Sequence, residues 1–400
     1  MEGRQIRGMQ IAAGGGLVPG EGHHLWSVPS QSERRKYRVD PIADRCDCPD
    51  HAATNLRCKH LWAVAFTMTA EVKPDGTTTL TETTRVTYSQ DWAAYNAAQV
   101  EEKDTFLTLL ADLCRTVPEP PQGRGRPRLP LSDMVFATTF KVFSRFSSRR
   151  FSSDLREAEA RGLISRVPHF NSVSNYMASP GLTPVLHELI SASSLPLRAV
   201  ESDFAVDSSG FSTSRFDQWL DFKYGTPKPA RSRHWLKAHL MVGVTTNVVT
   251  AVEISKWNSA DTRHFAPLVE ATASNFQIEQ VSADKAYLSH KNVELVEKVG
   301  GTPFIPFKRR NAAPLAVDAW GRMYHQFALN REEFMRHYHK RSNVESAFSM
   351  IKGKFGDSVL SKSIEGQANE VLCKVLAHNI VVVGQAMHEF GIEPIFTPAI

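Results

Sequence analysis

The order of apolar runs between residues 200 and 310 constrains the fold more than any other feature of this sequence. Three runs with strand-like composition come first, and helix-like and strand-like segments then alternate. A turn signal at 208–210 follows the first run, and residues 245–247 predict a hairpin between the second and the third. The predicted strands are 204–206, 239–244, 248–254, 278–283 and 302–307, and the predicted helices are 261–273 and 290–299. This order indicates an α/β domain with a mixed five-stranded sheet and helices on its faces.

Three carboxylates lie where such a sheet can bring them together. Asp207 follows the first apolar run, Asp284 follows the fourth, and Glu345 lies on a later helix. Side chains at the ends of sheet strands can converge on one site although they are far apart in the sequence. Carboxylates of this kind are the hard oxygen ligands that Mg²⁺ or Mn²⁺ prefers. Two such ions can activate a water molecule and stabilise the leaving oxygen of a phosphodiester.

Other acidic residues compete for the first and third of these positions. Asp203 shares a strand face with Asp207, because the two are an even number of residues apart. We prefer Asp207 because it ends the apolar run, where a side chain can project into a cleft. Glu332 or Glu333 could replace Glu345 only by giving up the helical spacing that Glu345 shares with Tyr338, Arg341 and Lys352. The competitors are Glu201, Asp203, Asp217, Asp221, Glu332 and Glu333.

Four polar residues fall on one stripe if residues 338–352 form a helix. With Tyr338 at zero and ~100° per residue, Arg341 lies near ~300°, Glu345 near ~340° and Lys352 near ~320°. A phenol, a guanidinium, a carboxylate and an ammonium on one stripe suit a metal ion held against a phosphate better than they suit a hydrophobic core. A solvated charged helix face is the alternative interpretation of the same spacing.

The spacing Tyr338-x2-Arg341-x3-Glu345-x6-Lys352 resembles the signature of bacterial insertion-sequence transposases of the DDE type. The segment Asp284-Lys285-Ala286-Tyr287 resembles the second-aspartate motif of that family, and residues 205–209 resemble the first. The resemblance covers about residues 121–390. It implies a ribonuclease H-like catalytic domain in which Asp207, Asp284 and Glu345 hold two Mg²⁺ or Mn²⁺ ions. It also implies that Tyr338, Arg341 and Lys352 contact the scissile phosphate or the flanking DNA.

The resemblance implies an enzyme, a DNA transposase that cuts the ends of an insertion sequence by metal-assisted phosphodiester hydrolysis. The freed 3′-hydroxyl would then be joined to target DNA. The partner is double-stranded DNA, and the need to hold two element ends implies a homodimer. A small-molecule cofactor is not expected. A DNA-binding regulator derived from a transposase, and a ribonuclease H-fold nuclease without strand transfer, are the alternatives.

A second motif, Cys46-x-Cys48-x9-Cys58-x-His60, lies near the N-terminus. Three thiolates and an imidazole can fill a closed, structural zinc site. A predicted strand at 37–40 precedes the motif, and a predicted helix at 61–68 follows it. The pattern resembles the SWIM zinc finger, including Trp26, and predicts a small ββα module that needs zinc to fold. Whether such a finger binds DNA or protein stays open, and His51 is the nearby competitor as a ligand.

Basic residues are concentrated in two stretches. Residues 121–166 and residues 305–354 each hold ten Lys/Arg against four Asp/Glu, whereas the whole chain carries a net charge of only +5. Such stretches indicate an extended polyanion as the partner. Within the first, Arg124, Arg126 and Arg128 form a strip that resembles an AT-hook core and could enter the minor groove of A·T-rich DNA. A basic linker without groove preference explains the strip equally well.

The remaining sequence predicts a soluble protein of the cytoplasm, associated with the nucleoid. Cys114 and Cys373 stand alone in apolar helical contexts and are predicted to be buried thiols. The run 371–383 is interrupted by polar residues and is predicted to be a packing helix, so a membrane is not expected as a partner. The predicted domains are a flexible tail at 1–20, a SWIM-type zinc finger at 21–85, a helical connector at 86–120, the AT-hook-like linker at 121–130, a helical DNA-binding domain at 131–199 and the ribonuclease H-like domain at 200–395.

Overall fold

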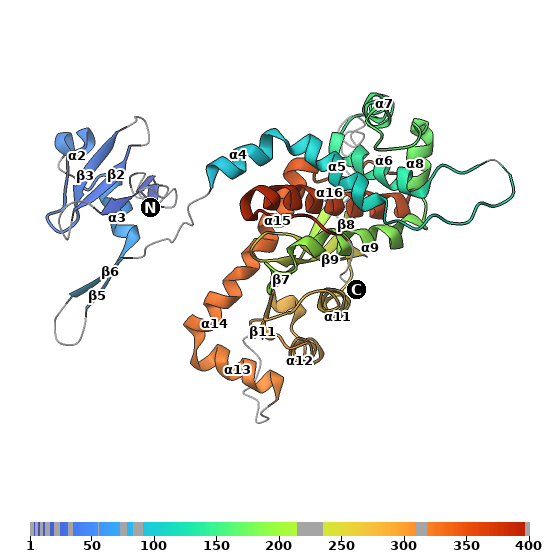
Figure 1. The fold of residues 1–400 in the computed structure, drawn as a ribbon. Helices are drawn as coiled ribbons and strands as arrows, with labels where there is room; N and C mark the ends of the chain where they lie inside the picture. The colour runs from blue at the N-terminus through green and yellow to red at the C-terminus, as the bar shows by residue number, and fades with distance from the viewer. Residues whose placement is uncertain are drawn as a thin grey trace, which may run out of the picture. The chain divides into compact units, whose positions relative to one another are not determined.

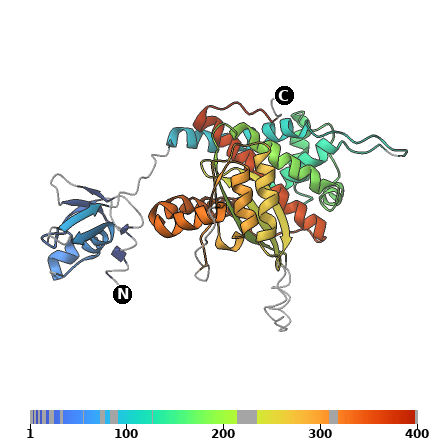
Figure 2. The ribbon, with the colours of Figure 1, turned by 90° about the horizontal axis from the view of Figure 1, so that it is seen from below.

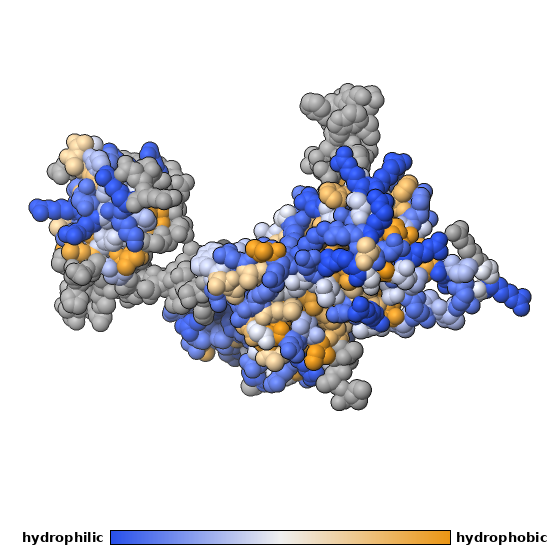
Figure 3. Space-filling model, turned by 45° about the horizontal axis from the view of Figure 1, so that its top comes forward, coloured by the Kyte–Doolittle hydropathy of each residue, from blue (hydrophilic) through white to orange (hydrophobic). Residues whose placement is uncertain are grey.

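A computed structural model of the chain divides into two compact units, Met1–Gln90 and Asp91–Ile400 (Figure 1). Each unit is described by itself. The face drawn in Figure 3 is mainly hydrophilic, with hydrophobic residues in separate patches. The structure describes residues 4, 7–8, 11–12, 17–19, 25–30, 35–54, 56–72, 78–82, 91–125, 127–213, 235–308 and 318–396.

The first unit is built on a small antiparallel sheet in the order β1-β2-β3-β4. Side chains of β3 alternate, so that Tyr37 and Val39 are buried and pack against Leu61 and Val64 of the following helix. The unit has more strands than the predicted ββα module: β1 and β4 have only two residues each and carry no periodic signal, and β5 and β6 form a separate two-stranded sheet. The elements are β1 (Val18–Pro19), β2 (Trp26–Pro29), β3 (Lys36–Asp40), β4 (Arg45–Cys46), α2 (Pro49–Thr54), α3 (Lys59–Thr67), β5 (Met68–Val72) and β6 (Thr78–Glu82).

The second unit contains a five-stranded mixed sheet in the order β11-β10-β7-β8-β9. Strands β7, β8 and β9 are antiparallel, and β10 runs parallel to both β7 and β11. This arrangement confirms the predicted mixed sheet and is consistent with a ribonuclease H-like domain. The strands are β7 (Asp203–Ser212), β8 (Trp235–Gly243), β9 (Val249–Lys256), β10 (Gln280–Ala283) and β11 (Thr302–Phe304).

Strand β7 continues through the predicted turn at 208–210, so that part of the prediction is wrong. Ser208 pairs with His239 and Gly210 pairs with Lys237, and the strand ends only at Ser212. The ladder satisfies the backbone groups of these turn-forming residues, which overrides their local preference. Asp207 therefore lies in the middle of a strand and not at its end.

Helices cover both faces of the sheet (Figures 1 and 2). Alternate residues of β7 face opposite sides, so Ala205 joins the core cluster that contains α9, α15 and α16, whereas Val206 joins the cluster that contains α11 to α14. The covering helices are α9 (Leu182–Ser194), α11 (Thr262–Ala273), α12 (His290–Lys298), α13 (Ala319–Leu329), α14 (Arg331–Tyr338), α15 (Ser342–Phe355) and α16 (Ile364–Phe390).

Among the helices that precede the sheet, α4, α5, α6, α8 and α9 contact α16, and α5 to α9 share its core cluster. Helix α16 is long and apolar enough to cross a membrane, but 78% of its most apolar window is buried, as expected of a core helix. Cys114 and Cys373 are buried in this cluster, which confirms their prediction. The preceding helices are α4 (Trp92–Val100), α5 (Glu102–Cys114), α6 (Leu131–Ser144), α7 (Ser152–Ala160) and α8 (Phe170–Met177).

Candidate functional site

The pairing register of β7 and β10 places two of the predicted metal ligands side by side. Ala283 of β10 pairs with Val206 of β7 in a parallel ladder. Asp284 is the next residue after β10 and has an extended backbone, with φ of −67° and ψ of 153°, so it lies beside Asp207. Neighbouring strands are about 4.8 Å apart. Paired residues of parallel strands point to the same face, and for these two aspartates that is the face covered by α15.

Arg341 connects Asp207 to the third predicted ligand. One guanidinium nitrogen, Nη1, donates to Asp207 Oδ2, and the other, Nη2, lies 2.6 Å from Glu345 Oε1. The backbone N–H of Ser208 donates to Asp207 Oδ1 at 2.7 Å. Burial raises the pKa of Asp207, and the charges of Asp284 and Glu345 raise it further, against the opposing effects of Ser208 and Arg341. The site therefore concentrates negative charge and favours a cation.

The segment that carries Tyr338 and Glu345 is not one continuous helix, so the predicted stripe is wrong in its geometry. Helix α14 ends at Tyr338, a 3₁₀ turn, η4 (His339–Arg341), follows, and α15 begins at Ser342. A 3₁₀ turn has ~3.0 residues per turn and so changes the angles calculated for an α-helix. Tyr338 and Arg341 nevertheless remain neighbours, because the guanidinium carbon lies 5.8 Å from the centre of the tyrosine ring.

Lys352, in the last turn of α15, contacts β7 two residues beyond Asp207. Its Nζ donates to Ser209 Oγ at 2.6 Å and lies 5.3 Å from the centre of the Phe211 ring. Ser209 is two residues beyond Asp207 on β7, so its side chain points to the same face. Burial lowers the pKa of Lys352. The structure thus brings these six residues together along β7, the end of β10 and the segment from the end of α14 to the end of α15: Asp207, Asp284, Tyr338, Arg341, Glu345 and Lys352.

Several competing carboxylates have structural partners. Asp203 Oδ2 accepts from Lys340 Nζ at 2.6 Å. Glu201 is buried and accepts from the backbone N–H groups of Thr245 and Thr246 at 3.1 and 2.6 Å, which fixes the β8–β9 hairpin. Glu333 pairs with Arg336 and His337 on α14. Glu332 is exposed in the first turn of α14, and Asp217 and Asp221 lie outside the described residues.

The four predicted zinc ligands converge in the first unit. Their ligand atoms lie within 4.8 Å of one another, and Cys46, Cys48, Cys58 and His60 are all buried. Three sulfurs and one ring nitrogen at this spacing match the donor set of a structural zinc site. A hydrogen bond from Cys46, together with those from His60 and the backbone of Leu61, lowers the pKa of Cys58 to about 3. The same hydrogen bond raises the pKa of Cys46, and burial raises the pKa of Cys48, so these two thiols must lose their protons to bind zinc as thiolates.

His51 lies apart from this cluster. Its Nδ1 lies 2.9 Å from the carbonyl oxygen of Leu56, whereas its backbone N–H donates to Cys48 Sγ at 3.4 Å. The ring is thus engaged with the loop, and only the backbone of His51 contacts the sulfur cluster.

The arginine strip belongs to an exposed loop between α5 and α6. Arg124 and Arg128 are exposed, and Arg126 lies outside the described residues. Glu119 holds the base of this loop, since its carboxylate accepts from the backbone N–H groups of Leu131 and Ser132 at 2.7 and 2.9 Å. Figure 1 shows the loop projecting on the far side of the second unit from α14. The structure therefore does not bring the strip to the carboxylates.

Comparison with known families supports an assignment for the sheet domain. Residues 198–380 match the family model of the transposase DDE domain. This segment is similar to a DDE domain. It contains the whole five-stranded sheet, the three carboxylates and most of α16. The match supports a DDE transposase, an enzyme that acts on DNA, and such enzymes use divalent metal ions. No solved structure matches the chain.

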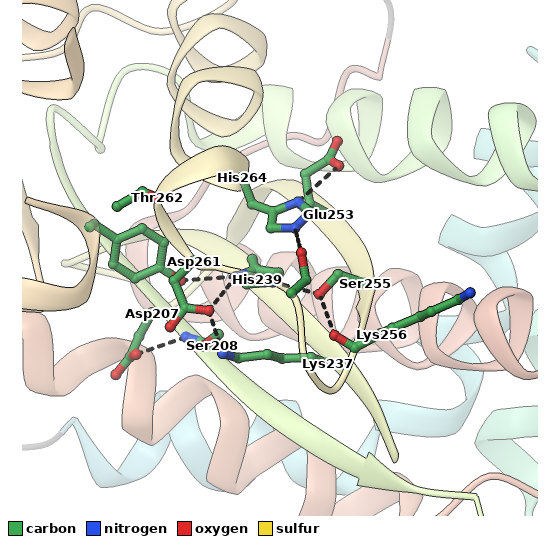
Figure 4. Close-up of polar contacts among 12 residues, drawn as sticks. Asp207, Ser208, Lys237, His239, Glu253, Ser255, Lys256, Asp261, Thr262 and His264 are labelled. Carbon is green, nitrogen blue, oxygen red and sulfur yellow. Dashed lines mark hydrogen bonds and ion pairs between the residues drawn. The ribbon is translucent and has the colours of Figure 1, made fainter. Parts of the chain in front are cut away.

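A polar network behind the carboxylates of the second unit was missed by the sequence analysis. It includes Lys237 and His239 of β8 and Asp261 before α11 (Figure 4), and the buried Tyr287 after β10 joins it through His239. A signal was present, because Lys237 and His239 are polar residues at alternate positions of an otherwise apolar strand. Such positions face one side of the sheet, and buried polar groups there require partners.

Proposed function

We propose that the protein is the DNA transposase of an insertion sequence, which cuts the element ends and joins the freed 3′-hydroxyl to target DNA. The observation that carries this proposal is the gathering of carboxylates inside the matched domain. Asp284 follows β10 in register with Asp207, and Arg341 connects Asp207 to Glu345. Clustered carboxylates repel one another, and divalent ions bound by hard oxygen ligands relieve that repulsion.

Asp207, Asp284 and Glu345 would hold two Mg²⁺ or Mn²⁺ ions, which activate a water molecule and stabilise the leaving oxygen. In the cutting step, the water oxygen bonds to phosphorus, the bond from phosphorus to the 3′ oxygen breaks, and that oxygen takes up a proton. In the joining step, the 3′-hydroxyl attacks a target phosphodiester and displaces the 3′ oxygen of the target strand. Both steps exchange one oxygen for another at phosphorus, so one set of residues serves both.

Arg341 and Lys352 supply the positive charge for the DNA backbone. Arg341 lies beside two of the carboxylates, and Lys352 follows the same face of β7. Cationic donors positioned before the reaction stabilise the charge that develops on a transferring phosphoryl group. We assign Arg341 to the scissile phosphate, and Tyr338 and Lys352 to the phosphate or the DNA beside it.

The test is cleavage of a DNA fragment that carries both flanks of the gene, in the presence of Mg²⁺. We expect wild-type protein to cut at inverted repeats, and Asp207→Asn and Glu345→Gln to lose cutting by about 10³-fold or more while still binding the fragment. Asp203→Asn is the matched control, since it makes the same change on the same face of β7 but breaks only the ion pair with Lys340.

Each outcome separates the candidate functions. Cutting retained by Asp207→Asn or Glu345→Gln contradicts the assignment of the ligands. Binding without cutting by the wild type favours a DNA-binding regulator derived from a transposase. Cutting without products in which an element end is joined to target DNA favours a nuclease of the same fold.

The remaining parts are assigned supporting roles in the same proposal. Cys46, Cys48, Cys58 and His60 hold a structural zinc ion in a SWIM-type module at 21–85, which binds DNA or protein. Arg124, Arg126 and Arg128 of the linker at 121–130 enter the minor groove, and the helical segment at 131–199 grips the element end. Two copies act together because two ends must be joined, and the protein works on the nucleoid in the cytoplasm.

A further inference from the structure

Three hydrogen-bonding side chains form a line through the sheet domain behind its carboxylates. The hydroxyl of Tyr287 lies 3.0 Å from His239 Nδ1, and His239 Nε2 lies 2.9 Å from Ser255 Oγ. Figure 4 shows His239 between Ser255 and Asp261, close to Ser208 of β7. Tyr287 and His239 are both fully buried, so the bond between them is made away from water, where a lost partner is costly, whereas the bond to Ser255 is only partly buried.

Tyr287 is tied to the two predicted aspartate ligands through the backbone. Its N–H donates to the carbonyl oxygen of Asp284 at 2.9 Å, which closes the 3₁₀ turn η3 (Lys285–Tyr287) directly after that aspartate. Its hydroxyl partner, His239, pairs with Ser208 in the β7–β8 ladder, and the side chain of Ser208 lowers the pKa of Tyr287 against the larger, opposing effect of burial. Ser208 follows Asp207 and donates its own N–H to Asp207 Oδ1 at 2.7 Å. One phenol therefore contacts the segments that carry both aspartates.

Further contacts hold this phenol in place from the opposite side. The side chain of Asn292 donates to the carbonyl oxygen of Tyr287 at 2.8 Å. Lys237 donates to Asp261, and the His264 ring stacks on His239 with centres 4.2 Å apart. Burial raises the pKa of Tyr287, so the phenol keeps its proton and can donate to His239. The network is thus anchored on β8, β9, η3 and the first turn of α12.

Ser255, His239 and Asp261 also have the residue types of a hydrolase triad, but their geometry does not suit one. His239 Nδ1 lies 3.0 Å from the Tyr287 hydroxyl and 3.8 Å from Asp261 Oδ1, so the closer partner is the phenol. Burial, followed by the charge of His264, lowers the pKa of His239 to about 4. A histidine with so low a pKa is a weak general base at neutral pH.

We propose that Tyr287, held by His239, is a positioning residue that fixes the separation of Asp207 and Asp284 for the divalent ions they bind. This inference rests on the proposed metal-dependent cleavage. Groups behind metal ligands orient them, and their removal lowers metal affinity or activity by ~10–100-fold. A rigid phenol between β7 and η3 explains how ligands from two separate chain segments keep a defined distance.

The experiment measures Mn²⁺ binding to the full chain without DNA, from the loss of the electron paramagnetic resonance signal of free Mn²⁺. The variants are Tyr287→Phe, which removes only the hydroxyl, and Ser208→Ala, which removes the β7 hydroxyl that acts on the phenol and leaves the phenol in the core. We expect each to weaken Mn²⁺ binding by ~10-fold and to raise the Mg²⁺ concentration needed for half-maximal cutting by a similar factor.

Tyr324→Phe is the matched control, because it deletes the same hydroxyl from a half-buried tyrosine packed against the same core cluster. We expect wild-type Mn²⁺ binding in that variant. Unchanged Mn²⁺ binding in both Tyr287→Phe and Ser208→Ala, or an equal loss in Tyr324→Phe, overturns the positioning role. Asp284→Asn identifies the share of Mn²⁺ bound at the carboxylates. If it binds Mn²⁺ as the wild type does, the metal site itself fails, and with it the proposed function.

Discussion

The two candidate metal sites of this chain are built in different ways. In the first unit, four ligand atoms from β4, α3 and the chain beside them lie within 4.8 Å of one another, and all four residues are buried. In the second unit, the carboxylates come from β7, from the residue after β10 and from α15, and the Glu345 side chain is 60% exposed. Closed sites of the first kind hold structural metals, whereas catalytic sites keep an open position.

The two sites also differ in how much of the surrounding core exists without them. The cluster of Cys46, Cys48, Cys58 and His60 is itself part of the small core of its unit, beside Val39 and Leu61. The carboxylates of the second unit lie on a sheet that has a large core on each face, and Arg341 already supplies a cation between Asp207 and Glu345. The first site should therefore need its metal to fold, and the second should need its metal only to react.

The largest predicted effect is on the first unit. His60→Ala should remove bound zinc and unfold Met1–Gln90, because zinc supplies about 10 kcal/mol or more to the folding of such modules. Asp91–Ile400 should keep its structure. Hydrogen exchange read by mass spectrometry, together with the zinc content, measures both results. His51→Ala is the control, since its ring contacts Leu56 and not the sulfurs. Loss of zinc from His51→Ala, or full protection of the first unit's amides from exchange in His60→Ala, would contradict the view that this unit needs its metal to fold.

The sequence predicted the cluster of cysteine and histidine side chains and the order of strands and helices along the chain, because both depend on local spacing. Cysteine and histidine ligands within 15 residues (46 to 60) can be grouped from sequence alone, and apolar runs with a two-residue period mark strands. The β7–β10 register, in contrast, joins Val206 to Ala283 across a long separation, and periodicity does not fix such pairings. The neighbouring positions of the two aspartates therefore follow from this pairing and not from the sequence pattern.

The errors have local causes. The residues at 208–210 have turn composition, yet pairing with β8 keeps them in β7, as tertiary contacts often override propensity. The 3₁₀ turn η4 interrupts a sequence with an unbroken helical pattern. The angles calculated for Tyr338, Arg341 and Glu345 on a continuous α-helix therefore do not hold. The link between Tyr287 and His239 spans 48 residues and leaves only a weak trace, two polar residues in an apolar strand.

The second prediction concerns the cation already present at the carboxylates. Arg341→Gln should lower the free energy of unfolding of the metal-free protein by about 2 kcal/mol, because it removes charge-assisted hydrogen bonds to Asp207 and Glu345 and leaves Asp207 partly buried beside other carboxylates. Mg²⁺ should then raise the melting temperature more in this variant than in the wild type. Thermal unfolding with and without Mg²⁺ measures the effect.

Arg336→Gln is the matched control for that measurement. Arg336 is 68% exposed and pairs with Glu333 on the surface of α14, so its loss should change stability by less than about 1 kcal/mol. A metal-free Arg341→Gln protein as stable as this control would show that the carboxylates do not depend on Arg341. The second site would then resemble the first in relying on its metal.

The smallest predicted effect is the change with pH in the stability of the second unit without metal. Burial, with the charges of Asp284 and Glu345, raises the pKa of Asp207 above its ordinary value of about 3.9. The native state therefore holds this proton more tightly than the unfolded state does. The resulting stability is fully present below about pH 4 and is lost as pH rises through the native pKa. Asp207→Asn cannot titrate, so the wild type should lose stability relative to this variant across that window.

Urea unfolding of both proteins between about pH 4 and pH 7 measures this difference, with Asp203→Asn as the control on the same strand. Mg²⁺ should reverse the trend, because it binds the ionised carboxylate and its stabilising effect grows as Asp207 loses its proton. Parallel stability curves for the wild type and Asp207→Asn without metal would show that the site tolerates the ionised aspartate without any cation beyond Arg341. The carboxylate site would then depend on its metal even less than its charges imply. The buried thiols of the first unit, in contrast, should need zinc both to lose their protons and to fold.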